Sequence, residues 1–166
     1  MSGNMEFGPR ALCNTTTLAL PLQENVELIN KMNNRSTIMP MAPVMLKENL
    51  DYFFNKEDYE KVIGSLEYMI VTLDYKDNDL DEFYDGIMHK YPLEERYSGR
   101  PQVITNENSI IYKILRRMEP DWKALINTSF NIHGRPIVNT MENAMTDYEY
   151  QLHNTYKTIK LYTNGK

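Results

Sequence analysis

The chain has 166 residues, of which 42% are hydrophobic and 25% are charged, the balance expected of one globular domain over residues 1–166. Its net charge of −5 provides no cationic field for a nucleic-acid duplex, so no nucleic-acid partner is expected. The single cysteine allows no internal disulfide, and no apolar run reaches the roughly 20 residues that span a bilayer, which predicts a cytoplasmic protein without membrane contact.

The first third of the chain predicts two helices between loop segments. Residues 1–20 are rich in Gly, Pro and Thr and predict a loop with short extended pieces. Apolar residues recur at helical spacing over 23–32, which predicts a helix there, and Pro40 and Pro43 exclude a helix after it. A second, short helix is expected over 47–55, where two phenylalanines and a leucine supply apolar side chains.

The middle of the chain predicts two strands and a further helix. Residues 67–75 are rich in aromatic and β-branched types and predict a strand, whereas the acidic stretch 76–95 predicts an irregular surface excursion. A short strand is expected over 102–105. Apolar residues at helical spacing predict a helix over 108–118, which Pro120 ends.

The last part of the chain continues this alternation. A buried strand is expected to start at 124–127, and Thr140 is expected to cap a helix that continues to about His153. Residues 155–162 predict a closing strand. Because helices and strands interleave along the chain, the fold class is α/β or α+β.

Two sequence segments are too specific to be generic. The first is GNMEFGPRAL at residues 3–12, and the second is LINTSFN at residues 125–131, followed by GRPIV at residues 134–138. They resemble the opening and the late signature of the C-terminal domain in the carbamoyltransferase family. That family includes antibiotic and nodulation-factor O-carbamoyltransferases.

Shorter blocks between these two segments follow the same order as in that family. They lie at residues 29–30 with 35–43, at residues 68–69 and at residues 100–102. The resemblance therefore covers roughly residues 3–145, nearly the whole chain.

The resemblance implies a YrdC-like fold, which is a twisted mixed sheet flanked by helices. It also implies a domain that binds carbamoyl phosphate and ATP, the latter with Mg²⁺, and forms a carbamoyl-adenylate. In the family, a second domain with an actin/sugar-kinase-like fold holds a metal and transfers the carbamoyl group to an acceptor hydroxyl. This sequence shows no such domain, so we expect a separate transfer subunit, no metal bound by this chain's own ligands, and no transfer by this chain alone.

The matched blocks contain four candidate substrate-binding residues: Arg10, Arg100, Asn127 and Ser129. Arginine can hold a phosphate through two parallel hydrogen bonds, which lysine cannot, so the two arginines suit anionic substrates. Asn127 and Ser129 lie two positions apart on an expected strand and therefore point to one face. There an amide and a hydroxyl suit the carbamoyl group and a phosphoryl oxygen. Adenylation relies on positioning and charge neutralisation, so no residue is assigned a covalent catalytic role.

Several positions depart from the family pattern. Asn33 stands where the family usually has lysine and Met39 where it has arginine, both at family phosphate contacts, and Lys31 or Arg135 are the candidate substitute cations. Cys13 replaces a glycine and is expected to be a small buried residue rather than a reactive thiol. Two alternatives stay open: an adenylate-forming component, or a catalytically degenerate module of the same fold that binds or regulates.

A separate transfer subunit would need an exposed apolar or aromatic surface on this chain. The candidates for this surface are Phe7, Tyr52, Phe53 and Tyr97.

Overall fold

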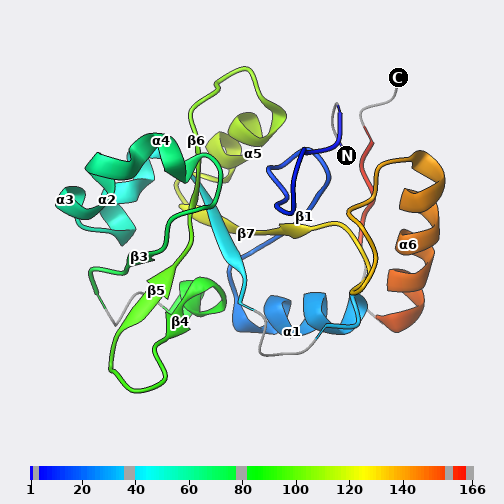
Figure 1. The fold of residues 1–166 in the computed structure, drawn as a ribbon, viewed down its shortest axis with the longest axis horizontal. Coiled ribbons are helices and arrows are strands. Elements are labelled where there is room, and N and C mark those ends of the chain that lie inside the picture. Colours follow the sequence, from blue (N-terminus) through cyan, green and yellow to red (C-terminus); the bar gives the residue numbers. More distant parts are fainter. Residues whose placement is uncertain (2–3, 36–39, 78–81, 156–158, 164–166) are drawn as a thin grey trace.

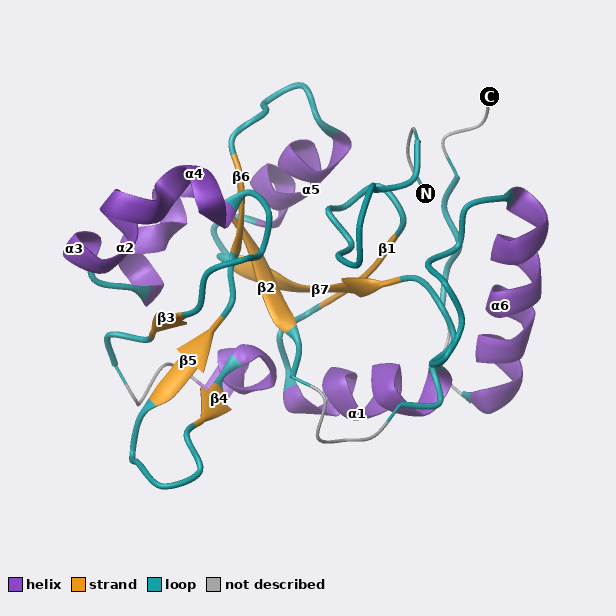
Figure 2. Ribbon diagram, in the orientation of Figure 1, coloured by secondary structure: helices purple, strands orange, loops and turns teal. Residues whose placement is uncertain are grey.

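The structure is a computed structural model that describes residues 1, 4–35, 40–77, 82–155 and 159–163 (Figure 1). A four-stranded sheet lies near its centre, and a three-stranded sheet of short strands lies to one side (Figure 2). The central sheet has the order β1-β7-β2-β6, with bounds Thr16–Ala19, Ala124–Ser129, Ala42–Leu46 and Gln102–Ile104. The smaller sheet has the order β3-β5-β4, with bounds Leu73–Asp74, Tyr97–Gly99 and His89–Lys90.

Helices surround the central sheet (Figure 1). The α-helices are α1 Gln23–Met32, α2 Leu50–Phe53, α3 Lys56–Tyr59, α4 Ile63–Leu66, α5 Ile110–Met118 and α6 Met141–Asn154. Short 3₁₀ helices are η1 Lys47–Asn49, η2 Glu60–Val62 and η3 Glu82–Ile87. In the described part of the chain, no helix combines the length and the apolar character that a bilayer crossing requires.

The central sheet is mixed, because β2 pairs parallel with β6 and antiparallel with β7. β1 pairs antiparallel with the other edge of β7. The predicted class, a mixed sheet flanked by helices, is confirmed, while its likeness to YrdC proteins stays a prediction.

The two faces of this sheet differ in what covers them, because successive strand residues point to opposite sides. Met45, Val103 and Ile126 lie on one face and pack in a large core with α1 and with Phe53. Apolar residues on the other face pack against α5, namely Val44, Leu46, Ile104 and Leu125. Farther along β7, this second face becomes polar at Asn127 and Ser129. The candidate site is built on this polar end.

One predicted strand is mostly absent from the structure and another is absent from its described residues. Residues 67–69 form a turn in which Met69 has a positive φ of 55°, so a strand over 67–75 is wrong except for β3. The described part of 155–162 belongs to no strand, and residues 156–158 lie outside the described residues. The 76–95 stretch is only partly an irregular excursion, because η3 buries Tyr84 and Ile87 in the core.

The structure also contains a central strand that was not predicted from the sequence. Pro40 and Pro43 indicated only the end of a helix, yet β2 includes Pro43 and is fully buried. Pro43 pairs with Ile126 of β7, and the pairing of β2 with β6 begins only at Val44. The proline therefore lies ahead of the parallel ladder, where its missing N–H removes no bond to β6.

Candidate functional site

Asn127 links four separate segments at the polar end of the sheet. Its Nδ2 donates to the carbonyl of Ala11 at 2.9 Å and to Gln102 Oε1 at 2.5 Å, and it lies 3.7 Å from the sulfur of Met69. Its Oδ1 accepts a hydrogen bond from the hydroxyl of Thr16. The side chain is buried, so these contacts hold the opening loop and β6 against β7.

Arg10 and Arg100 lie within electrostatic reach of each other, on the two segments that Asn127 bonds through Ala11 and Gln102. Arg100 is half-buried, and its Nε has no hydrogen-bond partner among the described residues. Burial lowers the pKa of Arg100, and the positive charge of nearby Arg10 lowers it further. His89 also lies within electrostatic reach of Arg100 and contacts the carbonyl of Met41 at 2.8 Å through Nε2. The cluster therefore concentrates positive charge beside a buried donor without a partner.

Arg35 reaches the end of β7 from the segment after α1. Its Nη1 donates to Thr128 Oγ1 at 2.5 Å, and its Nη2 donates to Ser129 Oγ at 3.0 Å and to Asn131 Oδ1 at 3.1 Å. Nη2 also donates to the carbonyl of Ser129 at 3.1 Å. Burial lowers the pKa of this guanidinium. Within the described residues, every recorded acceptor is a neutral oxygen.

The four predicted site residues therefore lie in connected segments of the fold, but their side chains fall into two different environments. Arg10 and Arg100 are neighbours, and the segments that carry them are tied to Asn127 by hydrogen bonds. Ser129 lies two residues farther along β7, on the same sheet face, with Arg35. Asn127 is not available to a ligand in this state, because it is 1% exposed and its amide is taken by internal partners.

Glu6 is a further residue of the site, which the sequence reading did not single out. Its buried carboxylate accepts hydrogen bonds from the backbone N–H groups of Leu12, Asn14 and Thr15, at 2.8 to 3.2 Å. These bonds curl the opening loop around the carboxylate and fix the segment that carries Arg10. An acid within a loop rich in Gly and Pro is the signal that could have indicated this role.

Cys13 lies in the same loop and is buried, as predicted. Its thiol donates to Gln102 Oε1 at 3.2 Å, and burial raises its pKa, so it remains protonated. Its φ of 72° is in the left-handed region, which glycine adopts more readily than any other residue.

Two cavities adjoin the polar end of the sheet. One, of about 580 Å³, lies between the opening loop, β6 and the start of α5, and Gln102, Cys13 and Tyr68 help to line it. The other, of about 750 Å³, lies beside β1 and α1, and its lining includes Thr16. Neither lining contains the four predicted site residues, although Gln102 and Thr16 are both partners of Asn127.

The positions that depart from the family pattern have internal roles in the structure. Asn33 is fully buried, and its Oδ1 accepts a hydrogen bond of 2.6 Å from Gln151 of α6. Arg135 pairs with Asp147 of α6 at 2.7 Å, so in this structure it is not a substitute pocket cation. Met39 lies outside the described residues.

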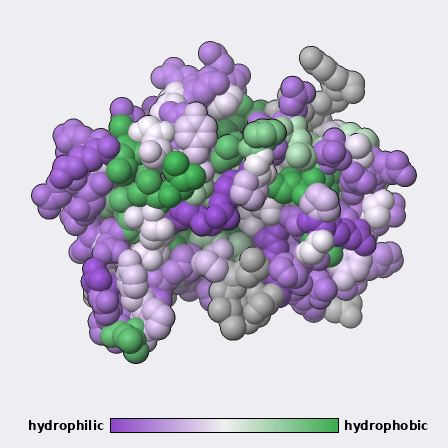
Figure 3. Space-filling model, in the orientation of Figure 1, coloured by the Kyte–Doolittle hydropathy of each residue, from purple (hydrophilic) through white to green (hydrophobic). Residues whose placement is uncertain are grey.

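Of the four residues expected on a docking surface, only Phe7 is fully exposed, at 106%. Tyr52 and Tyr97 are half-buried. The prediction of an exposed Phe53 is wrong, because α2 directs its ring into the core, where the ring makes an edge-to-face contact with Tyr84. Figure 3 shows hydrophobic surface on either side of a strongly hydrophilic strip in front of the central sheet.

No group of three or more His, Cys, Asp or Glu side chains in the described ranges is arranged to hold a metal ion. The groups gathered around the end of β7 are guanidiniums, a hydroxyl and amides, and the Glu6 carboxylate is engaged by backbone N–H groups of the opening loop.

The sequence matches known proteins over most of its length. The pattern of a family described as "Carbamoyltransferase C-terminus" matches residues 1–158. An uncharacterized protein of Methanocaldococcus jannaschii is 35% identical over 88% of this chain and 27% of its own. The nodulation protein NolO of Bradyrhizobium diazoefficiens is 28% identical over 89% of this chain and 26% of its own.

A 3′-hydroxymethylcephem-O-carbamoyltransferase of Amycolatopsis lactamdurans is 28% identical over 86% of this chain and 26% of its own. The chain thus spans about a quarter of the length of the curated relatives it matches.

Proposed function

The chain belongs to the carbamoyltransferase C-terminus family, and on that premise we propose that it binds carbamoyl phosphate and ATP and forms a carbamoyl-adenylate from them. The observation that carries this proposal is a pair of half-buried guanidiniums, Arg35 and Arg100, for which the described residues supply no carboxylate partner. Both substrates are anions that can fill that role.

The energetic argument rests on the cost of burying charge. A cation that leaves water loses several kcal/mol of hydration unless a counter-charge or good hydrogen bonds compensate it. Arg35 is compensated by neutral oxygens only, and Arg100 keeps an unpaired Nε. A phosphate group bound at either guanidinium would supply both the missing charge and the missing acceptors, through charge-assisted hydrogen bonds.

The proposed chemistry needs positioning more than covalent catalysis. Water hydrolyses carbamoyl phosphate to carbamate and inorganic phosphate, and an oxygen of the carbamate then attacks the α-phosphorus of ATP and displaces pyrophosphate. The guanidiniums of Arg10, Arg35 and Arg100 would neutralise charge that builds up on the phosphoryl oxygens. Mg²⁺ would arrive with ATP. Asn127 would act by holding the loop and strand that carry Arg10 and Arg100 rather than by touching the carbamoyl group.

Transfer to an acceptor hydroxyl would require another protein part. The relative from Amycolatopsis is named as an O-carbamoyltransferase, and this chain covers only 26% of its length. We propose that a separate actin/sugar-kinase-like part, with its own metal, receives the adenylate. A dry path between the two sites would protect that labile intermediate from water, and the fully exposed Phe7 lies three residues from Arg10, where such a part would dock.

Calorimetry with ATP and with carbamoyl phosphate tests the binding half of this proposal. Arg35→Lys and Arg100→Lys each keep a positive charge but lose the fork of donors, and each should weaken binding about tenfold. Arg117→Lys is the matched control, since Arg117 is exposed on α5. Equal affinities for all three variants would contradict the assignment of the site. Binding without any adenylate formation would favour the degenerate binding module.

A further inference from the structure

Helix α6 carries two buried polar side chains on one face. Asp147 is 4% exposed and Gln151 is 2% exposed, and residues four apart lie on the same side of a helix. Most buried polar groups in folded proteins have hydrogen-bond partners. The hydrogen bonds that Asp147 and Gln151 make both connect, through other residues, to Arg35.

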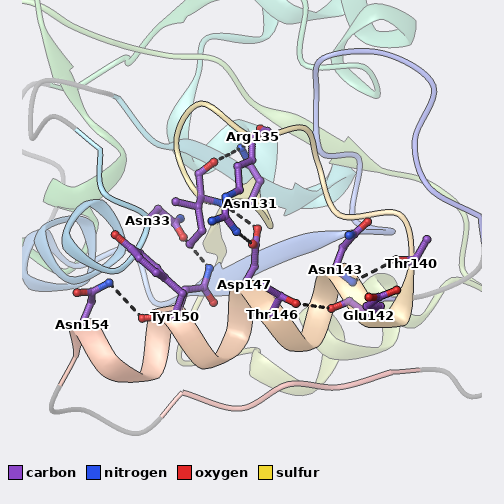
Figure 4. A network of polar contacts seen from close by, with 12 residues as sticks. Asn33, Asn131, Arg135, Thr140, Glu142, Asn143, Thr146, Asp147, Tyr150 and Asn154 are labelled. Atoms are coloured by element: carbon purple, nitrogen blue, oxygen red, sulfur yellow. Dashed lines mark hydrogen bonds and ion pairs between the residues drawn. The ribbon is translucent and has the colours of Figure 1, made fainter.

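Asp147 fixes the loop that follows β7. Its Oδ2 accepts the backbone N–H of Ile132 at 3.1 Å, and its Oδ1 pairs with Arg135 Nη1 at 2.7 Å (Figure 4). One carboxylate therefore holds the loop at two points, three residues apart in sequence.

The held loop in turn orients Asn131. The amide nitrogen of Asn131 donates to the carbonyl of Arg135 at 2.8 Å and to that of Ile132 at 3.1 Å. With the nitrogen so engaged, the amide oxygen faces the site, where it accepts from Arg35 Nη2 at 3.1 Å and from Ser129 Oγ at 2.5 Å.

Gln151 holds Arg35 from the other side. Its Nε2 donates to the Oδ1 of Asn33, the residue that ends α1, two positions before Arg35. The backbone carbonyl of Asn33 also accepts from His133 N at 2.8 Å, so the end of α1 is tied to the same loop.

We propose that Asp147 and Gln151 are positioning residues that set the orientation of the Arg35 guanidinium for anion binding. They act through Asn131 and Asn33 and do not touch the ligand themselves. An arginine side chain loses rotamer entropy when it is immobilised, so holding it in place before the anion arrives removes part of the cost of binding. The identity of the anion rests on the proposed function, but the positioning does not.

Two readouts test this proposal, and one of them needs no ligand. In nitrogen-15 NMR, an arginine held by fixed acceptors shows separate signals for its two Nη groups, because rotation about the Cζ–Nε bond is hindered. Arg35 should show this separation in the native protein and lose it in Asp147→Asn, while Glu149→Gln, an exposed acid on the same helix, keeps it. Inorganic phosphate and ATP are the probes for binding, which Asp147→Asn should weaken about tenfold.

Two further variants keep the test decisive. Arg135→Gln removes the ion pair at a half-exposed position and should reproduce the NMR change if Asp147→Asn fails to fold. Gln151→Leu should mobilise Arg35 from the other side. Unchanged Arg35 signals in a folded Asp147→Asn or Arg135→Gln variant would overturn the positioning role. Failure of the native protein to bind either probe, with Arg35 signals that still respond to Asp147, would contradict the proposed function alone.

Discussion

At the scale of single residues, the site is defined by which polar atoms have partners and which do not. Asn127 is exposed by 1% and fully engaged, whereas the Nε of Arg100 is buried without a partner among the described residues. A residue type alone could not distinguish these cases, because both residues lie in segments that resemble the family. The distinction depends on contacts between β7 and segments more than a hundred positions away.

A single residue, His89, is expected to make the stability of the fold depend on pH. Burial lowers its pKa, and Arg100 lowers it further, while its contact with the Met41 carbonyl partly opposes them. The folded pKa thus lies below the unfolded value near 6.5. Below about pH 6.5 the unfolded state binds more protons, so stability falls as pH drops through this window and does not depend on His89 above it.

The expected result is a smaller loss of stability in His89→Gln than in the native protein when urea unfolding at pH 5.5 is compared with pH 7.5. Proton NMR of the folded protein should place the midpoint of the His89 imidazole below that of free histidine. Identical pH dependence in both proteins would count against this account of His89.

Asn33 supplies a second residue-scale prediction. Sequence resemblance suggested that a lysine here would restore a phosphate contact, but the side chain is fully buried and bonded to Gln151. Asn33→Lys would bury an ammonium without a counter-charge and should lower the free energy of unfolding by about 2–4 kcal/mol. It should not tighten ATP binding. His133→Lys, at an exposed position of the adjoining loop, is the control and should leave stability nearly unchanged.

At the scale of elements, local patterns predicted helices better than strands. The helix over 23–32 is α1, and Thr140 caps α6 by accepting the N–H of Asn143 at 3.1 Å, because periodicity and capping are local properties. The strand over 67–75 failed because its first residues form a turn directly after α4, with Met69 in the left-handed region, despite their β-rich composition. β2 was missed because prolines are typical of loops, and one proline lies just before this strand and another lies within it. Only the pairing with β7 reveals the strand.

The candidate site shows the same division. Arg10, Arg100 and Ser129 were found from the matched segments, because each segment is continuous in sequence. The part played by Arg35 depends on its bonds to Thr128 and Ser129, 93 and 94 positions away, which no local pattern encodes.

The opening loop is the element whose shape Glu6 determines. In Glu6→Gln, an amide nitrogen replaces one acceptor and meets the backbone N–H of Thr15, which donates to both carboxylate oxygens. We expect a loss of about 1–3 kcal/mol in unfolding free energy. We also expect weaker ATP binding, since Arg10 would lose its fixed position. Urea unfolding and calorimetry measure the two effects. An exposed acid replaced in the same way, Glu27→Gln on α1, should change neither.

At the scale of the whole molecule, the fold brings Arg10 within electrostatic reach of Arg100 and separately places Arg35 at the polar end of β7, in a mixed sheet whose other parts are apolar. The chain covers about a quarter of its relatives' length. We therefore expect the isolated chain, given ATP, carbamoyl phosphate and hydroxylated acceptors, to form no carbamoylated product. Robust product formation by the chain alone would contradict the need for a separate transfer part, while leaving the adenylate site in place.

The most direct test of the central claim is ATP–pyrophosphate exchange by the purified chain, with and without carbamoyl phosphate. If the chain forms a carbamoyl-adenylate, label from pyrophosphate should enter ATP only when carbamoyl phosphate is present. The exchange rate should fall about tenfold or more in Arg100→Lys and stay unchanged in Arg117→Lys. No exchange by a folded native chain, even after addition of the transfer region of a full-length relative, would contradict the claim.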